Sequence, residues 1–199
     1  MSDPHRFADT GVTLFDLATH FVVHCPKCEG KALINPYEDS WRLTCTSCFH
    51  SERPGHWYGM MTAYVSVKCR ECRNQLTRSA VVEGQWNKLK LKCDQCGDEC
   101  EYEAHLSKQQ MKDGLMCDPV FGLNLWLQKP VGDDLFWAYH YEHLALLEQY
   151  VRAKLRERGI DNKGSKNSLM FSRLPAFITK AGNREEMLKL INELQVKTL

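Results

Sequence analysis

Four Cys-x-x-Cys pairs constrain this chain more than any other feature of its sequence. They form two tandem quartets, in which sixteen residues separate the pairs of the first and twenty separate those of the second. Each quartet fits the C-x2-C, 15–20 residues, C-x2-C pattern of a four-thiolate zinc site. Two residues between cysteines let a tight turn direct both sulfurs at one metal, about 2.3 Å away. The sequence therefore predicts two Zn²⁺ ions, one bound by Cys25, Cys28, Cys45 and Cys48, the other by Cys69, Cys72, Cys93 and Cys96.

The surroundings of the cysteines favour metal ligands over disulfides. The chain has 199 residues, 43% of them hydrophobic and 26% charged, which is ordinary for a soluble globular protein. The N-terminus MSDPHRFADTG lacks the basic and apolar regions of a secretory signal, and no apolar run approaches the length of a membrane span. We therefore expect a cytoplasmic protein without membrane contact, where a disulfide framework, the alternative for ten cysteines, is disfavoured.

The formal net charge of +1 counts every thiol as neutral. A site with four thiolates and one Zn²⁺ carries a charge of −2, so two sites change +1 to −3. The bulk charge therefore predicts no general affinity for nucleic acid. Any such affinity has to come from a local basic patch.

The expected fold class is α+β, with two tandem zinc-ribbon units, a third cysteine-free hairpin and a C-terminal helical region. Thr13 and Asp16 form a capping-box-like start for a short helix within residues 11–24, which runs into a strand. The expected divisions are a lead-in at 1–20, ribbon one at 21–56, ribbon two at 57–103, a linker and aromatic hairpin at 104–139, and the helical region at 140–199.

Each ribbon is expected to hold a hairpin between two cysteine turns. In the first, strands at Ala32–Ile34 and Trp41–Thr44 flank the turn-rich NPYEDS. In the second, strands at Gln75–Val82 and Trp86–Lys92 flank EGQ. Leucines and lysines alternate along the last strand, as expected for a half-buried strand.

The lysine row of this strand, Lys88, Lys90 and Lys92, has three interpretations. The lysines could contact phosphates, protect a solvated strand edge, or offset the thiolate charge nearby. The sequence does not separate these alternatives.

Other metal-ligating side chains lie near the quartets. Histidine can replace cysteine at zinc, and three histidines lie near the quartets: His24, His50 and His56. The cysteines already complete both sites, so we expect these histidines to lie on the surface or beside the metal ligands without binding the metal. Cys100 and Cys117 are left over. Neither has the local signature of a catalytic cysteine, and we expect buried or free thiols.

The C-terminal part predicts a hairpin followed by helices. Leu123–Gln128 and Leu135–Tyr139 are its expected strands, sized to pack against the ribbons, and residues 104–118 are expected to be irregular. From His140, apolar residues at helical spacing through Leu155 predict a helix ending near Gly159. The pattern N-R-E-E at 183–186 predicts a capping box for a last helix.

Basic residues concentrate between Arg152 and Arg184, where nine lysines and arginines accompany two acids. On the predicted helix, Arg152 and Arg156 would lie one turn apart, as would Lys154 and Arg158. The candidate nucleic-acid-binding residues are Lys88, Lys90, Lys92, Arg152, Lys154, Arg156, Arg158, Lys166, Arg173, Lys180 and Arg184.

The two cysteine units resemble zinc ribbons, the rubredoxin-like knuckle fold of transcription-factor-B-type, ribosomal and polymerase ribbons. The segments FGLNLWLQKPVGDDLFWAYHYEHLALLEQYVRAKLRER and NSLMFSRLPAFITKAGNREEMLKLI resemble the C-terminal part of a family of bacterial zinc-ribbon-containing proteins. Members often carry cysteine in the hairpin turn, where this chain has Lys129-Pro130-Val131-Gly132, which implies no metal there. The resemblance covers most of residues 21–195 and implies a bacterial cytoplasmic protein, without an activity.

Three functional classes compete. A nucleic-acid-binding module, DNA or RNA, would use the basic segment and the ribbon surface, and this is the function we expect first. A protein–protein adaptor, with ribbons as structural staples, is the alternative. A redox or enzymatic role is third, because four-thiolate sites also bind iron, but paired carboxylates, a Gly-rich phosphate loop and an open catalytic zinc site are missing from the pattern.

Overall fold

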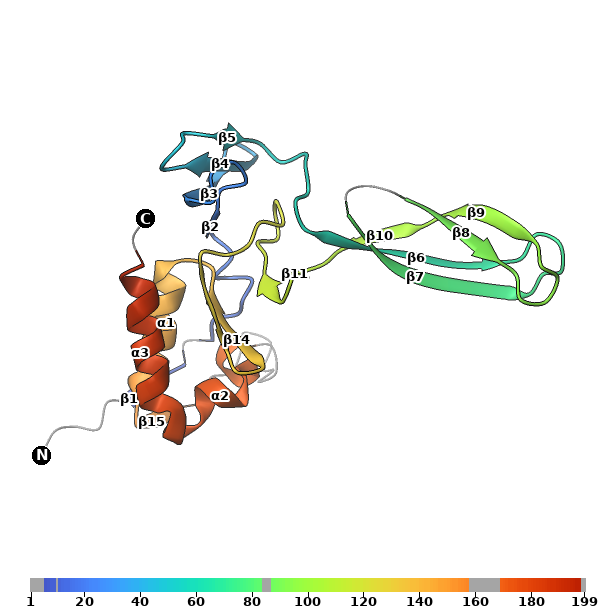
Figure 1. Cartoon of the computed structure of the whole chain (residues 1–199). Coiled ribbons are helices and arrows are strands. Elements are labelled where there is room, and N and C mark those ends of the chain that lie inside the picture. The colour runs from blue at the N-terminus through green and yellow to red at the C-terminus, as the bar shows by residue number, and fades with distance from the viewer. Residues whose placement is uncertain (1–5, 10, 84–86, 158–168, 198–199) are drawn as a thin grey trace, which may run out of the picture. The chain divides into compact units, whose positions relative to one another are not determined.

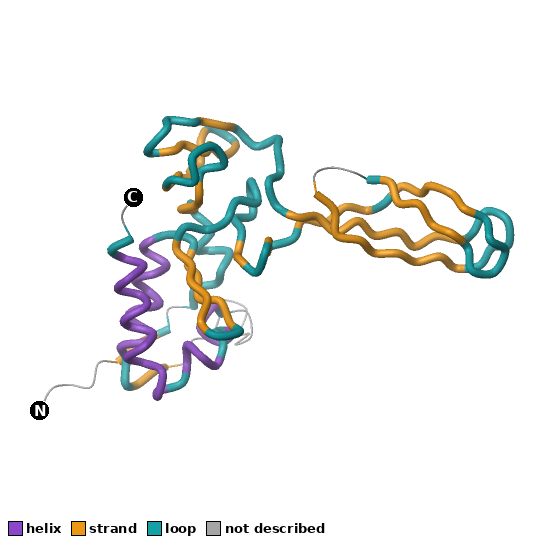
Figure 2. Tube along the Cα trace, in the orientation of Figure 1, coloured by secondary structure: helices purple, strands orange, loops and turns teal. Residues whose placement is uncertain are grey.

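The structure, a computed structural model, describes residues 6–9, 11–83, 87–157 and 169–197. Its contacts divide the chain into two compact units. Unit 1 comprises Met1–Arg53 and Leu125–Leu199, and unit 2 comprises Pro54–Asn124. Figure 1 labels the elements of both units, and Figure 2 shows that helices belong to unit 1 whereas the described part of unit 2 is built from strands and loops.

Unit 1 contains a four-stranded antiparallel sheet with the order β2-β3-β4-β5, which is the first ribbon. A hairpin, β13-β14, and three α-helices complete it together with the short parallel pair β1-β15. The bounds are β1 Arg6–Ala8, β2 Phe21–His24, β3 Lys31–Tyr37, β4 Ser40–Cys45, β5 Ser51–Glu52, β13 Leu127–Val131, β14 Asp134–Ala138, α1 Tyr141–Arg152, β15 Leu155–Glu157, η1 Met170–Arg173, α2 Ala176–Thr179, η2 Ala181–Asn183 and α3 Arg184–Gln195.

The first ribbon is joined to the rest of unit 1 through β2. The Val22 N–H donates to the Tyr139 carbonyl (2.8 Å), and the Trp126 N–H donates to the Val22 carbonyl (2.8 Å). Val23 forms an antiparallel bridge with Leu125. Strand β2 is therefore hydrogen-bonded to β3 and also to the chain on both sides of the β13-β14 hairpin.

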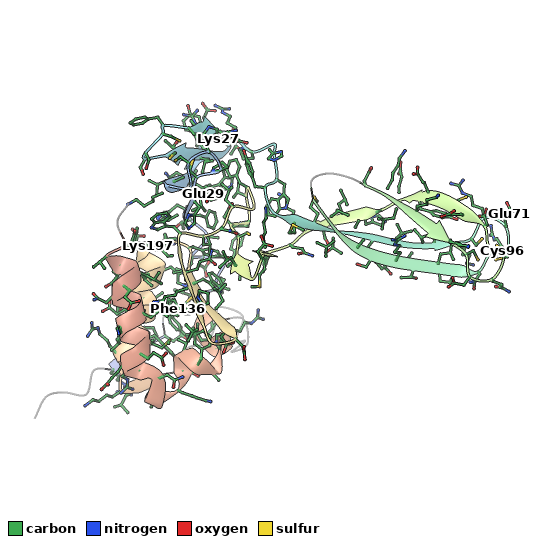
Figure 3. The ribbon with its side chains drawn as sticks, viewed as in Figure 1. Lys27, Glu29, Glu71, Cys96, Phe136 and Lys197 are labelled. Atoms are coloured by element: carbon green, nitrogen blue, oxygen red, sulfur yellow. The ribbon has the colours of Figure 1, made fainter. Side chains whose placement is uncertain are left out.

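The core of unit 1 lies between this hairpin and the helices. Helices α1 and α3 run side by side (Figure 1), and α3 buries Met187, Leu190, Ile191 and Leu194, the i, i+3, i+4, i+7 stripe of an amphipathic helix. Figure 3 shows Phe136 of β14 among the core side chains, and it is 0% exposed. Eighteen buried residues form this cluster, so unit 1 has a substantial apolar core of its own.

Unit 2 contains the second cysteine quartet, and its longest elements are two paired nine-residue strands, β6 and β7. Strand β10 pairs with the other edge of β6, and β8-β9 form a separate antiparallel pair. The expected hairpin between the strands at 75–82 and 86–92 is therefore wrong, because β7 pairs with β6 and β8 pairs with β9. Leu89 and Leu91 of β8 are buried while its lysines are exposed, which confirms the predicted alternation. The bounds are β6 Met60–Lys68, β7 Gln75–Glu83, β8 Lys88–Lys92, β9 Glu99–Glu103, β10 His105–Lys108, β11 Met111–Lys112 and β12 Leu115–Met116.

The predicted helix from His140 to Gly159 is shorter than expected. Helix α1 ends at Arg152, and Ala153 is extended. Leu155, expected in the apolar stripe, lies in β15 and is 52% exposed. Strand β15 leaves the helical path to pair with β1, so Arg152 and Arg156 do not lie one turn apart on one helix. Gly159 is outside the described residues.

Three other local expectations differ from the structure. Residues 14–19 form hydrogen-bonded turns rather than a helix, although Thr13 and Asp16 do bond reciprocally (2.8 and 3.3 Å). The segment 104–118 is not irregular, because β10 pairs with β6 and β11 pairs with β12. Asn183 directly precedes α3, as predicted. Its side chain, however, donates to the Phe177 carbonyl (3.0 Å) instead of capping the helix.

The third hairpin begins later than the sequence suggests. Strand β13 starts at Leu127 and includes Pro130, and β14 returns from Asp134. The connection is the two-residue loop Gly132-Asp133, where Gly132 has a positive φ of 60°, a conformation that favours glycine in tight hairpins.

Candidate metal centres

The structure brings each predicted cysteine quartet together. In the first quartet, the Sγ atoms of Cys25 and Cys48 are 3.7 Å apart, and those of Cys28 and Cys45 are 3.5 Å apart. In each quartet all four sulfurs lie within 4.8 Å of one another. The matching distances in the second quartet are 3.6 Å for Cys69 and Cys96 and 3.5 Å for Cys72 and Cys93.

These distances fit a tetrahedral metal. Four sulfurs placed about 2.3 Å from one Zn²⁺ lie about 3.8 Å from each other. All ten cysteines are free thiols, and no disulfide distance occurs within either quartet. The donor set and its spacing therefore suit two closed zinc sites, in which the metal would cross-link the two turns of each ribbon.

The backbone of all four cysteine turns has one design. The first cysteine of each pair donates its N–H to the carbonyl five residues later, at distances of 2.7–2.8 Å. The residue directly after the second cysteine has a positive φ in every turn: Glu29, Phe49, Arg73 and Gly97. Only one of the four is glycine, so three turns hold a strained residue in the left-handed region. This repetition defines a shared knuckle, which the Cys-x-x-Cys spacing alone did not reveal.

The turns also supply hydrogen bonds to the sulfurs. In the first site, burial raises the pKa of the Cys45 thiol, but the backbone N–H groups of Cys48 and Ser47 donate to its sulfur (3.4 Å each), and the net effect lowers this pKa from 9.0 to about 6. In the second, the Cys96 N–H is the largest cause that lowers the pKa of Cys93 to about 6. Within the same quartets the pKa of Cys28 and of Cys96 is raised to about 12, despite backbone N–H donors at Gly30 and Asp98, because the other cysteines share hydrogen bonds with them. Each site therefore pairs a thiol that ionises readily with one that keeps its proton, and a bound metal would release the remaining protons.

The two sites share a pattern of burial. The first cysteine of every pair is buried, at 0–1% exposure, whereas the second lies nearer the solvent. Figure 3 labels Cys96 at one end of unit 2, beside Glu71 of the facing turn. The two quartets are consequently shallow, and four cysteine ligands would complete the coordination of a metal bound there, as in structural zinc sites.

The nearby histidines and spare cysteines lie outside both quartets. The His24 ring contacts the Glu29 carbonyl (3.0 Å), and His50 pairs with Glu52 (3.1 Å). Cys100 donates to Asp98 (3.6 Å). Cys117 is buried and donates to the side-chain oxygen of Asn124 (3.3 Å), and burial raises its pKa to about 11.

A third cluster of potential ligands was missed by the sequence analysis. Donor atoms of His20, His140 and Glu142 lie within 4.8 Å of one another. The His20 and His140 rings, however, are stacked at 4.1 Å with only 19° between their planes, so no single ion lies in the plane of both. The His140 ring bonds the Leu17 carbonyl through Nε2 (2.8 Å), and its Nδ1 accepts from the His143 N–H (3.1 Å). The cluster therefore fixes the start of α1.

The lysine row of β8 faces a row of glutamates on β9. The strands are antiparallel and in full register, so each lysine lies directly opposite an acid, and Lys90 also forms a salt bridge with Glu99 (3.3 Å). Opposite charges at such positions attract across a sheet. The face is thus a charge-balanced ladder, with the pairs Lys88–Glu103, Lys90–Glu101 and Lys92–Glu99.

The other basic candidates are dispersed. Arg152 binds Glu148 through two nitrogens (2.8 and 2.6 Å). Arg184 donates to the Val151 and Ala153 carbonyls (3.0 and 3.1 Å), which caps the end of α1. Lys154, Arg173 and Lys180 are exposed at separate places: between α1 and β15, at the end of η1, and between α2 and η2. The side chain of Arg156 and the whole of Arg158 and Lys166 lie outside the described residues.

Comparison with known proteins adds no relative to this picture. Neither a protein-family model, nor a curated protein, nor a solved structure matches the chain. The resemblance to zinc ribbons consequently rests on the two cysteine clusters. Among the described helices, none is both long and apolar enough to span a membrane.

Proposed function

We propose that this protein is a non-enzymatic adaptor, in which two zinc ions hold rigid surfaces that bind another protein. The observation that carries the proposal is the charge-balanced ladder of β8 and β9. A polyanion such as DNA or RNA is attracted by unpaired cations, whose counterions it releases. A surface of alternating paired charges favours instead a partner of complementary pattern, which is a property of proteins.

The engagement of other basic residues supports the same conclusion. Arg152 is held by Glu148, and Arg184 satisfies the last carbonyls of α1. These two arginines therefore have structural partners within unit 1. Nucleic-acid binding, our first expectation from the sequence, remains a prediction that requires other cations to provide the phosphate contacts.

Phe49 is a candidate contact residue for the partner. It follows Cys48 in the first ribbon, has a φ of 58°, and its side chain is 82% exposed. A β-carbon at positive φ is strained, and an exposed phenyl ring gains no burial. An exposed aromatic side chain on a rigid turn is suited to bury itself in a partner's pocket.

The variant Phe49→Gly separates these roles. Glycine relieves the backbone strain, so we expect unchanged zinc content and unchanged or higher thermal stability. Tagged wild type and variant, both nuclease-treated, would be used to recover partners from a lysate of the source organism at moderate salt. We expect a defined protein in stoichiometric amount with the wild type and a weaker yield with Phe49→Gly, while Phe15→Gly, which removes another exposed phenyl ring (88%), serves as control.

A titration against mixed-sequence DNA and RNA at two low salt concentrations distinguishes the adaptor from a nucleic-acid-binding module. The adaptor predicts no measurable binding. Binding that weakens with salt, with a slope of about −0.9 per phosphate contact for duplex DNA, would contradict the adaptor and support the nucleic-acid module. Metal analysis addresses the redox alternative, because we expect about two colourless zinc ions per chain, whereas visible absorption of the purified protein would indicate iron.

A further inference from the structure

Unit 1 contains a largely apolar cavity that the metal centres do not use. Its volume is ≈ 230 Å³. Its floor is formed by residues that are fully or nearly buried, and its rim by half-buried or exposed ones. The lining comes from the lead-in, β14, α1, η1 and α2: Leu14, Leu135, Trp137, His143, Leu147, Met170, Arg173, Leu174, Pro175 and Ile178.

One polar group stands in the floor of this cavity. His143 is 2% exposed, and its Nδ1 accepts a hydrogen bond from the Tyr139 N–H (3.2 Å). A backbone N–H only donates, so the neutral ring carries its proton on Nε2. Burial, followed by the nearby His140, lowers the pKa of His143 from 6.5 to about 3, which keeps the ring neutral.

The Nε2–H group is a donor without a protein acceptor among the described residues. The structure gives the ring one hydrogen bond as acceptor, through Nδ1, and aromatic contacts with Trp137 and Tyr139. Among the described residues, the Tyr102 hydroxyl is the one side-chain N or O atom that is fully buried without a hydrogen-bond partner. The His143 Nε2–H is therefore accessible from the cavity, where water can accept from it. A bound molecule that carries an acceptor would take the place of that water.

The size of the cavity limits the occupant. Protein interiors hold few voids larger than a water molecule, and an apolar cavity of about 150 Å³ binds benzene. By proportion, ≈ 230 Å³ accommodates about nine non-hydrogen atoms. We infer that this cavity binds a small aromatic or branched aliphatic molecule with one carbonyl oxygen, whose apolar body packs on Leu147 and Ile178 and whose oxygen accepts from His143.

Acetophenone and α-methylstyrene test this inference as a matched pair. Both have nine non-hydrogen atoms and the same branching, and the second has CH₂ in place of the carbonyl oxygen. The zinc-loaded full chain, labelled with ¹⁵N-histidine, would be titrated with each molecule by NMR. We expect acetophenone to shift the Nε2–H resonance of His143 strongly and α-methylstyrene to shift it little.

Two variants locate the site. Leu135→Trp fills the rim of the cavity and should abolish binding of both molecules, whereas Val131→Trp, on the neighbouring strand outside the lining, should preserve it. In His143→Phe the preference for acetophenone over α-methylstyrene should fall about fivefold, the worth of one hydrogen bond. Should His143→Phe fail to fold, the resonance shift in the wild type still decides.

The inference is overturned by any of three results. The first is that neither molecule binds up to its solubility limit. The second is that Leu135→Trp binds both as the wild type does. The third is that acetophenone binds without perturbing the His143 Nε2–H resonance.

Discussion

The two cysteine quartets have the same geometry but very different structural surroundings. In unit 1 the first ribbon is joined through β2 to a hairpin and three helices, whose core cluster has eighteen buried residues and no cysteine. In unit 2 the cluster around the second quartet has seven buried residues, and two of these, Cys69 and Cys93, are predicted metal ligands. Five other buried hydrophobic residues in the described part of unit 2 lie outside that cluster: Trp57, Met61, Cys117, Phe121 and Leu123. The apolar cluster beside the second quartet is therefore small, and a metal bound by Cys69 and Cys93 would be part of it.

Two identical cysteine motifs can therefore contribute unequally to the folding of the units that contain them. A small domain buries too little apolar surface for stability and depends on metals or disulfides. Metal-binding free energy then becomes folding free energy, as in zinc fingers. We expect the second metal to determine whether unit 2 folds, and the first metal to order a ribbon on a unit that already has a core.

The largest expected effect comes from removing one ligand in each site. Cys93→Ser should abolish the second metal site and unfold unit 2, because this residue belongs to the core cluster as well as to the quartet. Cys45→Ser should disorder the first ribbon but leave helices α1 and α3 folded, since their core contains no cysteine. Metal analysis together with far-UV circular dichroism checks both. Equal loss of structure in the two variants would contradict the comparison.

Removing a large buried side chain from the core of unit 1 should destabilise unit 1 and leave unit 2 unchanged. Phe136 is 0% exposed, and Phe136→Ala removes its ring from the helix–hairpin core. Such substitutions typically cost about 3–5 kcal/mol. We expect the unfolding transition of unit 1 to move to lower denaturant concentration while unit 2 keeps its transition and both metals remain bound. A matched shift of the unit 2 transition would show that the units do not fold independently.

The buried histidine of α1 gives unit 1 an acid sensitivity. The pKa of His143 is lowered to about 3 by burial, and an unfolded histidine has a pKa of about 6.5. The unfolded state therefore binds a proton that the folded state refuses, so stability present above pH 6.5 is lost as the pH falls toward 3. At pH 5 the loss is about 2 kcal/mol.

His143→Gln isolates this contribution, because an amide oxygen can still accept from the Tyr139 N–H without titrating. Urea unfolding of both proteins at pH 7 and pH 5 gives the difference and cancels any common loss of metal. Identical pH dependence of the two proteins would rule out His143 as the source.

The smallest effect is expected on the charged ladder of unit 2. Lys90 is exposed and forms one salt bridge with Glu99. Exposed ion pairs contribute no more than about 1 kcal/mol, so Lys90→Ala should change the unit 2 transition by less than this, and 1 M salt should remove the difference. A larger, salt-independent change would mean that the ladder stabilises the ribbon by another route.

Features that depend on local spacing could be predicted from the sequence. The two quartets assemble as expected because two residues between cysteines determine a turn. The alternation of buried Leu89 and Leu91 with exposed lysines is likewise a property of one strand. The start of α3 after Asn183 was also predicted, although the Asn183 side chain does not make the capping bond on which that prediction rested.

Features that depend on distant partners could not be predicted. Helix α1 ends at Arg152, and Arg184 caps this end although it lies 33 and 31 residues after the two residues whose carbonyls it binds. The strand that follows, β15, pairs with β1 near the start of the chain. Strand β10 looked irregular because its partner, β6, lies more than 35 residues earlier. The role of the lysine row stayed open between its alternatives because the opposing glutamates are recognised only from the strand register.

The unequal roles of the two metals can be measured directly by chelation. The zinc-loaded chain, labelled with ¹⁵N, would be titrated with a strong chelator while amide resonances of both units are followed by NMR. We predict that unit 2 resonances, such as those of Ala63 and Val65, collapse to unfolded positions as its metal leaves. Resonances of Leu147 and Ile191 in unit 1 should keep their folded positions after both metals are removed. Folded resonances of Ala63 and Val65 in the metal-free chain would contradict the account.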